Sequence, residues 1–210
     1  MSSSRPPSPR ARTAPHKVRI IGGRFKRTPL PVLNLPGLRP TPDRVRETVF
    51  NWLHHLWQGD FAGKTVLDAF AGTGALGFEA ASRGVKEAIL IEADRRAAAG
   101  LEAVRTRLGA DNVRILVGNA ETALAQGTLP RFDLILLDPP FGQGWLERIV
   151  PLALRMLTAE GMLYVEAEAP VEAPPGTELL RQDRAGSVHF HLFCLESGTQ
   201  GAETSDMRNG

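Results

Sequence analysis

The sequence predicts an α/β fold with a mostly parallel sheet, one antiparallel strand near the C-terminus, and a small N-terminal extension made of a hairpin and a helix. Two observations support this prediction. Between residue 65 and about residue 157, short apolar runs alternate four times with stretches of helical periodicity, which is typical of parallel strands joined by crossover helices. A glycine-rich turn joins the first apolar run to the first helical stretch, as in doubly wound α/β sheets.

The predicted elements follow in a simple order. Residues 18–32 indicate a hairpin that turns at Gly22-Gly23, and residues 43–57 indicate an amphipathic helix. The crossover helices are expected near residues 75–83, 95–108, 119–125 and 145–157. A fifth parallel strand is expected at 162–166. The segments 178–182 and 187–195 alternate without a helix between them, so we expect a closing hairpin that contributes the antiparallel strand.

The glycine-rich turn has the spacing G-x-G-x-x-G at Gly72, Gly74 and Gly77, where missing side chains allow a sharp turn and a close approach to a ligand. About twenty residues further on, the second apolar run ends in Glu92, whose carboxylate could accept both hydroxyls of a ribose. Both features suit a dinucleotide-binding dehydrogenase as well as a protein that binds S-adenosylmethionine.

Two side chains favour S-adenosylmethionine. Asp68 precedes the glycines, where a carboxylate would repel a pyrophosphate but could face a positively charged amino-acid group. Asn119 follows the third apolar run, and its amide could read an adenine edge, although it would equally suit a helix N-cap. Phe70, inside the loop, lines the pocket or fills the core. The predicted cofactor-binding residues are Asp68, Phe70, Ala71, Gly72, Gly74, Glu92, Asn119 and Ala120.

The catalytic group is predicted at Asp138, Pro139, Pro140 and Phe141, directly after the fourth apolar run. The two prolines donate no N–H, so the turn offers the Asp138 carboxylate and the Pro139 carbonyl as acceptors for a planar amine, with the Phe141 ring beside them. Proteins commonly hold an unstacked base in this way. The same residues also occur as ordinary turn chemistry after a strand.

Charge is distributed unevenly along the chain. The net charge is +2, but residues 1–46 hold 11 Lys or Arg and one acid, a balance of +10, while the other 164 residues carry −8. The N-terminal part should therefore attract a polyanion such as RNA, unless it is only a solvated, solubilising arm. The predicted RNA-binding residues are Arg19, Arg24, Lys26, Arg27, Arg39, Arg44 and Arg46.

Three segments, residues 68–77 (DAFAGTGALG), 90–92 (LIE) and 138–141 (DPPF), resemble those of class I S-adenosylmethionine-dependent methyltransferases that modify exocyclic amines. Residues 20–23 (IIGG) and 38–53 (LRPTPDRVRETVFNWL) are similar to the N-terminal signature of the RsmD family, the bacterial 16S rRNA guanine-N2 methyltransferases. This resemblance implies a Rossmann-like class I methyltransferase fold. It also implies methyl transfer to the N2 of one guanine of 16S rRNA, within an assembled or assembling small ribosomal subunit.

Two rival functions stay open. The same fold could methylate adenine N6 or a protein glutamine amide, since both substrates present a planar NH2. From a different class, the chain could be a non-catalytic RNA-binding assembly factor with a vestigial pocket. The intact Asp138 and glycine turn argue against the second rival, and the arginine-rich N-terminal segment argues against a protein substrate.

Composition sets the remaining expectations. No apolar run approaches the length of a membrane span, so we expect no membrane contact. Cys194 is the one cysteine, so we expect no internal disulfide and no metal bound by a thiolate cluster, which fits a reducing cytoplasm. The histidines lack the context of a metal site, so we expect no metal. We expect a monomer with a disordered basic tail (1–16), an RNA-binding hairpin and helix (17–58), a methyltransferase domain (59–196) and a disordered C-terminal tail (197–210).

Overall fold

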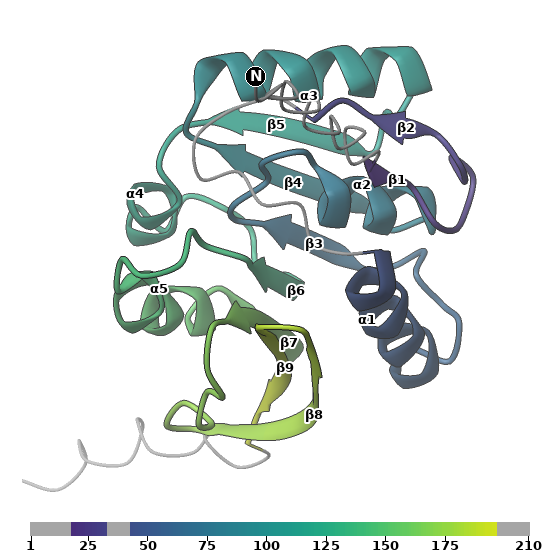
Figure 1. Ribbon diagram of the computed structural model, residues 1–210. Helices are drawn as coiled ribbons and strands as arrows, with labels where there is room; N and C mark the ends of the chain where they lie inside the picture. Colours follow the sequence, from purple (N-terminus) through teal and green to yellow (C-terminus); the bar gives the residue numbers. More distant parts are fainter. Residues whose placement is uncertain (1–17, 33–42, 197–210) are drawn as a thin grey trace, which may run out of the picture.

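A central sheet dominates the computed structural model, which describes residues 18–32 and 43–196 (Figure 1). The predicted tails at 1–16 and 197–210 lie outside these ranges. Within them, seven strands form the sheet in the order β5-β4-β3-β6-β7-β9-β8. Their bounds are β3 Thr65–Asp68, β4 Glu87–Glu92, β5 Val113–Val117, β6 Phe132–Leu137, β7 Leu157–Ala167, β8 Thr177–Ala185 and β9 Val188–Leu195.

The strand directions confirm the predicted fold class. Strands β5, β4, β3, β6 and β7 pair in parallel, and β9 pairs antiparallel with both of its neighbours, β7 and β8. The chain winds outward from β3 to β5 and then crosses back to place β6 on the other side of β3. Open α/β sheets bind their ligands at such a reversal, beyond the carboxyl ends of the strands.

Helices cover both faces of the sheet, because side chains alternate along each buried strand. The helices are α1 Asp43–Leu56, α2 Ala75–Ser82, α3 Arg95–Leu108, α4 Ala120–Ala125 and α5 Trp145–Leu154. Val66 belongs to the apolar cluster shared with α1, α2 and α3, whereas its neighbour Leu67 belongs to the cluster shared with α4 and α5. In the part of the chain that the structure describes, no helix has the length and apolarity needed to cross a membrane.

Two predicted boundaries differ from the structure at the junction of α5 and β7. The helix ends at Leu154 rather than near residue 157, because β7 already begins at Leu157. The register against β6 then jumps from Leu157 to Met162, so the extra residues of β7 bulge out of the pairing. Gly161 lies in this bulge, where a Cβ atom would come within 2.8 Å of the Phe132 carbonyl oxygen.

The N-terminal hairpin is held mainly by a loop and only slightly by strand pairing. Strands β1 (Val18–Arg19) and β2 (Pro29–Leu30) have two residues each, and residues 21–27 form a wide loop in place of the tight turn expected at Gly22-Gly23. The loop docks on the end of α2, where the Arg24 N–H donates to the Ser82 carbonyl (2.7 Å) and the Phe25 N–H to the Ser82 hydroxyl (2.8 Å). This docking requires a glycine at position 23, because φ is 71° and a Cβ would lie 1.9 Å from the Ser82 oxygen.

Candidate active site

Two predicted site carboxylates come from adjacent strands at the reversal of the sheet. Asp68 is the last residue of β3 and pairs in register with Leu136 of β6, and Asp138 follows one residue after the end of β6. Because the two strands are parallel, both acids lie at the same edge, and alternation puts both side chains on the α1 face of the sheet. The structure thus brings together two residues that are 70 positions apart.

Asp68 is a buried carboxylate under the glycine turn, with a relative exposure of 2%. Its Oδ2 accepts a hydrogen bond from the Gly77 N–H (2.9 Å), whereas Oδ1 has no hydrogen-bond partner among the described residues. Burial raises the pKa of Asp68 to about 7; the backbone N–H groups of Gly77 and Phe70 oppose this shift, and the negative charges of Asp138 and Glu92 add to it. A buried acceptor without a donor suits a ligand that carries a cationic amine.

The glycine turn needs its glycines for different reasons. Gly72 and Gly74 have φ angles of 51° and 76°, in the left-handed region, and Gly74 is the N-cap of α2. Gly77 lets the helix approach the sheet, because a Cβ there would lie 2.6 Å from Cγ of the buried Leu90. Close packing of helix on strand is the role expected for the third glycine of this pattern.

Glu92, at the end of β4, holds the glycine turn in place. Its Oε2 accepts from the Gly72 N–H (2.8 Å), and its Oε1 accepts from the Asp94 N–H (2.8 Å). The adjacent Ala71 N–H donates to the carbonyl of Ile91 (2.9 Å), so the turn is bound to β4 at two points. Each carboxylate oxygen has a second lone pair, so contact with ribose hydroxyls stays compatible with this geometry and stays a prediction.

Asn119 takes the simpler of the two roles open to it. It is the N-cap of α4, and its Oδ1 accepts from the Thr122 N–H (3.1 Å). The helix begins at Ala120, which is buried. The Asn119 side-chain amide is exposed at the same edge of the sheet as Asp68 and Asp138. An adenine contact through its NH2 group stays a prediction.

The Asp-Pro-Pro-Phe segment forms the rim between β6 and α5. Asp138 and Phe141 are half-buried, while Pro139 is buried and Pro140 is exposed. Behind this rim, Phe70 of the glycine turn packs edge to face against Trp145 of α5, with ring centroids 5.4 Å apart. Phe70 therefore contributes to the apolar cluster shared with α5, which is one of the two roles that the sequence left open.

Two residues of β7 extend the site and were missed by the sequence analysis. Leu137 pairs in register with Val165, so Glu166 lies beside Asp138, and the buried Tyr164 hydroxyl donates to Glu166 Oε1 (2.8 Å). Burial raises the pKa of Tyr164 well above its usual value, and the charges of Glu166 and Asp138 raise it further. The signal was present in the sequence, since an acid ends an apolar strand here as it does at Asp68.

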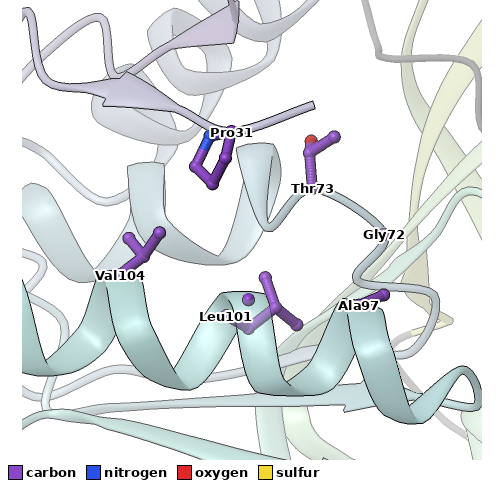
Figure 2. A pocket seen from close by; sticks show the side chains of 7 residues that line it. Pro31, Gly72, Thr73, Ala97, Leu101 and Val104 are labelled. Carbon is purple, nitrogen blue, oxygen red and sulfur yellow. The ribbon is translucent and has the colours of Figure 1, made fainter. Parts of the chain in front are cut away.

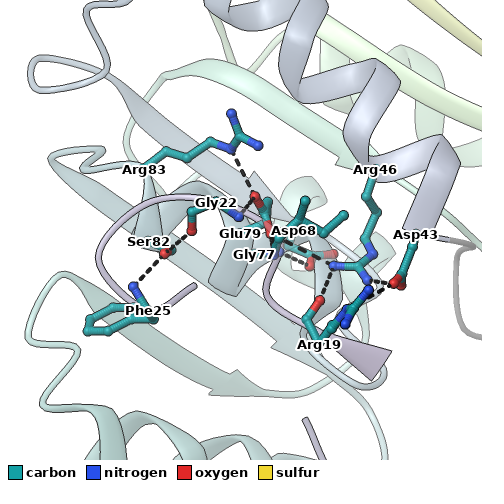
Figure 3. Close-up of polar contacts among 11 residues, drawn as sticks. Arg19, Gly22, Phe25, Asp43, Arg46, Asp68, Gly77, Glu79, Ser82 and Arg83 are labelled. Atoms are coloured by element: carbon teal, nitrogen blue, oxygen red, sulfur yellow. Dashed lines mark hydrogen bonds and ion pairs between the residues drawn. The ribbon is translucent and has the colours of Figure 1, made fainter. Parts of the chain in front are cut away.

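Arg46 does not fit its predicted contact with RNA, because the structure buries it completely (0% exposed). Its guanidinium donates to the Arg19 carbonyl (2.8 Å) and to Asp43 Oδ1 (2.6 Å), and lies 3.8 Å from Glu79 (Figure 3). Glu79 also accepts from the loop that docks on α2 and from Arg83. Arg46 thus joins the hairpin, α1 and α2. Its guanidinium could not reach a phosphate without breaking this network.

The other predicted RNA-binding residues in the described ranges are exposed, and they fall into two groups. Arg19 and Arg44 lie where β1 meets the start of α1, with the Arg19 Nε atom 3.5 Å from Asp43. Arg24, Lys26 and Arg27 lie on the loop at the C-terminal end of α2, which is the sheet edge opposite the carboxyl ends of the strands (Figure 1). Arg39 lies outside the described residues.

Other candidate sites carry less chemistry. A small, mostly apolar pocket lies between Pro31, the glycine turn and α3 (Figure 2). Of the predicted cofactor residues it includes Gly72, and it contains none of the site acids. In residues 18–32 and 43–196, no group of three or more His, Cys, Asp or Glu could hold a metal ion.

Comparison with known proteins identifies the family. The family model described as "Conserved hypothetical protein 95" matches residues 18–194. The "Ribosomal RNA small subunit methyltransferase D" of Escherichia coli K12 is 40% identical over 195 residues, covering 90% of this chain and 95% of that protein. This chain belongs to the RsmD family. The Haemophilus influenzae member with the same name is 38% identical, over 84% of this chain and 93% of that protein.

Solved structures agree with this membership. A structure from Escherichia coli, named as a proposed methyltransferase, yhhF, superposes with a TM-score of 0.76 at 41% identity and covers 86% of this chain and 99% of that one. A proposed methylase from Haemophilus influenzae gives a TM-score of 0.72 at 34% identity, with the same coverage. The fold is therefore the Rossmann-like methyltransferase fold that the resemblance to the RsmD family implied.

Proposed function

We propose that this chain transfers a methyl group from S-adenosylmethionine to the exocyclic N2 of one guanine in 16S rRNA, acting as a monomer on an assembled or assembling small subunit. One observation carries the proposal: Asp68 under the glycine turn and Asp138 on the rim lie on neighbouring strands at one sheet edge. A donor held at the first carboxylate would therefore lie beside an amine held at the second. The names of the RsmD-family relatives support rRNA as the substrate.

The residues present fit the donor. The Asp68 Oδ1 atom is buried without a partner among the described residues, and it suits the donor's amino group. Gly72 and Gly74 give the turn its left-handed backbone, and Glu92 and Asn119 lie at the ends of the next two strands, where the ribose and the base would extend. When bound, S-adenosylmethionine supplies a methyl group on a positively charged sulfur and leaves as a neutral thioether.

At the acceptor end, the chain's own residues orient the amine. The N2 lone pair of guanine is delocalised into the ring, so the amine is a poor nucleophile. Hydrogen bonds from N2 to the Asp138 carboxylate and the Pro139 carbonyl would pyramidalise the nitrogen and direct its lone pair at the methyl carbon. As the N–C bond forms and the C–S bond breaks, Asp138 accepts the proton that N2 releases. Phe141 stacks on the base, a contact worth about 1–3 kcal/mol in comparable complexes.

The exposed basic residues support a large RNA substrate. The group Arg24, Lys26 and Arg27 lies at the edge of the sheet opposite Asp138, so an RNA that contacts both places must extend along the full length of the strands. A folded RNA surface could do so, which favours a folded subunit over a short strand.

The test is transfer of radiolabelled methyl from S-adenosylmethionine to small subunits from cells that lack this enzyme, followed by digestion to nucleosides and chromatography. We expect label in N2-methylguanosine. Label in N6-methyladenosine would keep the fold and refute the base and atom. Absence of label from RNA and protein, together with failure to bind the donor, would refute the enzymatic function in favour of a non-catalytic assembly factor.

A further inference from the structure

Three carboxylates stand side by side on one face of the sheet, at the carboxyl ends of three neighbouring parallel strands. They are Asp68 at the end of β3, Asp138 directly after β6 and Glu166 near the end of β7. The first two have roles in the proposed function, the donor amine and the guanine N2. Glu166 is as deeply buried as Asp68, at 2% exposure, although a charged side chain at a strand end could easily be placed in solvent.

The orientation of Glu166 is set by its own strand. Tyr164, two residues earlier on the same face, is completely buried and donates its hydroxyl to Glu166 Oε1 (2.8 Å). The register of β6 against β7 places Glu166 beside Asp138, and the charges of both carboxylates raise the pKa of Tyr164. A side chain held this way is fixed in space before any substrate arrives, as a selective site requires.

The chemistry of the acceptor base gives this carboxylate a role. The edge of guanine that carries N2 presents three N–H bonds, two on N2 and one on N1. Asp138 and the Pro139 carbonyl match the two on N2. In adenine the ring nitrogen beside the amine carries no hydrogen and is an acceptor, so a carboxylate facing it would be repelled and left without a donor.

We propose that Glu166, oriented by the Tyr164 hydroxyl, accepts a hydrogen bond from guanine N1–H and is the residue that selects guanine over other bases with an exocyclic amine. This inference rests on the proposed function and adds to it the physical basis of its base specificity. Asp138 binds the reacting amine, which many bases offer, and Glu166 reads the neighbouring ring nitrogen, which distinguishes guanine.

The test compares two acceptors that differ at the ring nitrogen. The guanosine methylated by the wild-type enzyme is located in ribonuclease fragments by mass spectrometry, and small subunits are then reconstituted with guanosine or 2-aminopurine riboside at that position. 2-Aminopurine keeps the amine but has no hydrogen on N1. We expect the wild-type kcat/KM to favour guanosine by at least about tenfold, since one hydrogen bond to a charged group is at stake.

Glu166→Gln separates recognition from folding. We expect kcat/KM on guanosine to fall about tenfold or more and the preference to shrink or reverse, because the Gln amide can donate to the bare ring nitrogen of 2-aminopurine. Glu160→Gln, on the exposed end of the same strand, should keep the wild-type preference. If Glu166→Gln slows both acceptors equally, Glu166 is only structural and the inference is wrong, although the methyltransferase function would stand.

A second variant guards against a folding defect. Tyr164→Phe keeps the buried ring and removes the hydroxyl that orients Glu166, so we expect a smaller loss of preference, about threefold, with unchanged donor binding measured by calorimetry. An unchanged preference in this variant would contradict the inference. If the wild-type enzyme forms no N2-methylguanosine at all, the proposed function fails first, and this specificity role fails with it.

Discussion

Glu79 is the buried counter-charge that attaches the N-terminal extension to the main sheet, so its removal should destabilise the protein far more than the loss of a surface acid. Its carboxylate accepts from the N–H groups of Ile21 (2.6 Å) and Gly22 (2.9 Å) and from Arg83 Nε (2.9 Å), and it lies 3.8 Å from Arg46. Both Glu79 and Arg46 have fully buried side chains. Asp43 lies closer to Arg46 but is 45% exposed, so solvent screens its charge.

The cost follows from what Glu79→Ala leaves behind. Arg46 keeps its buried charge with only a screened partner, and two backbone N–H groups of the docking loop lose their acceptor. Removing one member of a buried pair costs about 3–5 kcal/mol, a large part of the roughly 5–15 kcal/mol that stabilises a typical domain. At about 2–4 °C per kcal/mol for a chain of this size, we expect the Tm to fall by roughly 6–20 °C.

Thermal unfolding followed by circular dichroism measures this loss, and Glu102→Ala is the matched control. Glu102 also pairs with an arginine on its own helix, Arg105, but its side chain is 48% exposed, so we expect a change within about 1 kcal/mol. Replacing Arg46 and Glu79 together with Met and Leu should cost less than the two single changes combined, because Arg46 is then not left as a buried charge without its partner. A Glu79→Ala protein as stable as Glu102→Ala would refute the assignment of Glu79 as the buried anchor.

Three further outcomes are expected. Asp138→Ala should abolish methyl transfer but leave donor affinity, measured by calorimetry, within tenfold of wild type; a larger loss would place Asp138 in the donor site. Asp68→Asn should weaken donor binding and yet raise the Tm at pH 8. Burial raises the pKa of Asp68 from 3.8 to about 7, so the folded wild-type protein loses stability as pH rises through that range, and an unchanged Tm–pH profile in the variant would contradict this. Gly77→Ala should cost about 1–3 kcal/mol by overpacking, and the double variant with Leu90→Ala should cost less than the sum of the two single changes, because the new Cβ would meet the Leu90 side chain; urea unfolding of the single and double variants tests this.

The glycine turn and the acid that ends β4 could be predicted because they are set by local sequence. Gly72, Gly74 and Glu92 occur at a fixed spacing along one strand-turn-helix unit and the strand that follows, and the geometry of such a unit depends little on the rest of the chain. Asn119 shows where local reasoning stops, since helix capping and base recognition need the same residue at the same place. The structure shows the cap.

Charge in the sequence predicted contact with RNA, but it could not separate exposed arginines from a buried one. Arg44 and Arg46 are two positions apart on α1, and helical geometry points one to solvent and the other at α2. Burial then depends on Glu79, which lies 33 residues away, and on a loop that no local pattern connects to it. The prediction for Arg46 was wrong for this reason, while Arg19, Arg24, Lys26, Arg27 and Arg44 stay candidates for contact with RNA.

The sequence by itself determined the sheet, its parallel direction, the glycine turn and the acids that end its strands, because these depend on periodicity and on turn chemistry within a few residues. Only the tertiary structure decided which strand ends are neighbours. The reversal at β3 and β6 joins Asp68 to Asp138, and the register of β6 against β7 adds Glu166 and Tyr164. Strand order and register are set by the packing of two apolar faces over the whole domain, so a group of residues assembled from three strands cannot be predicted from any one of them.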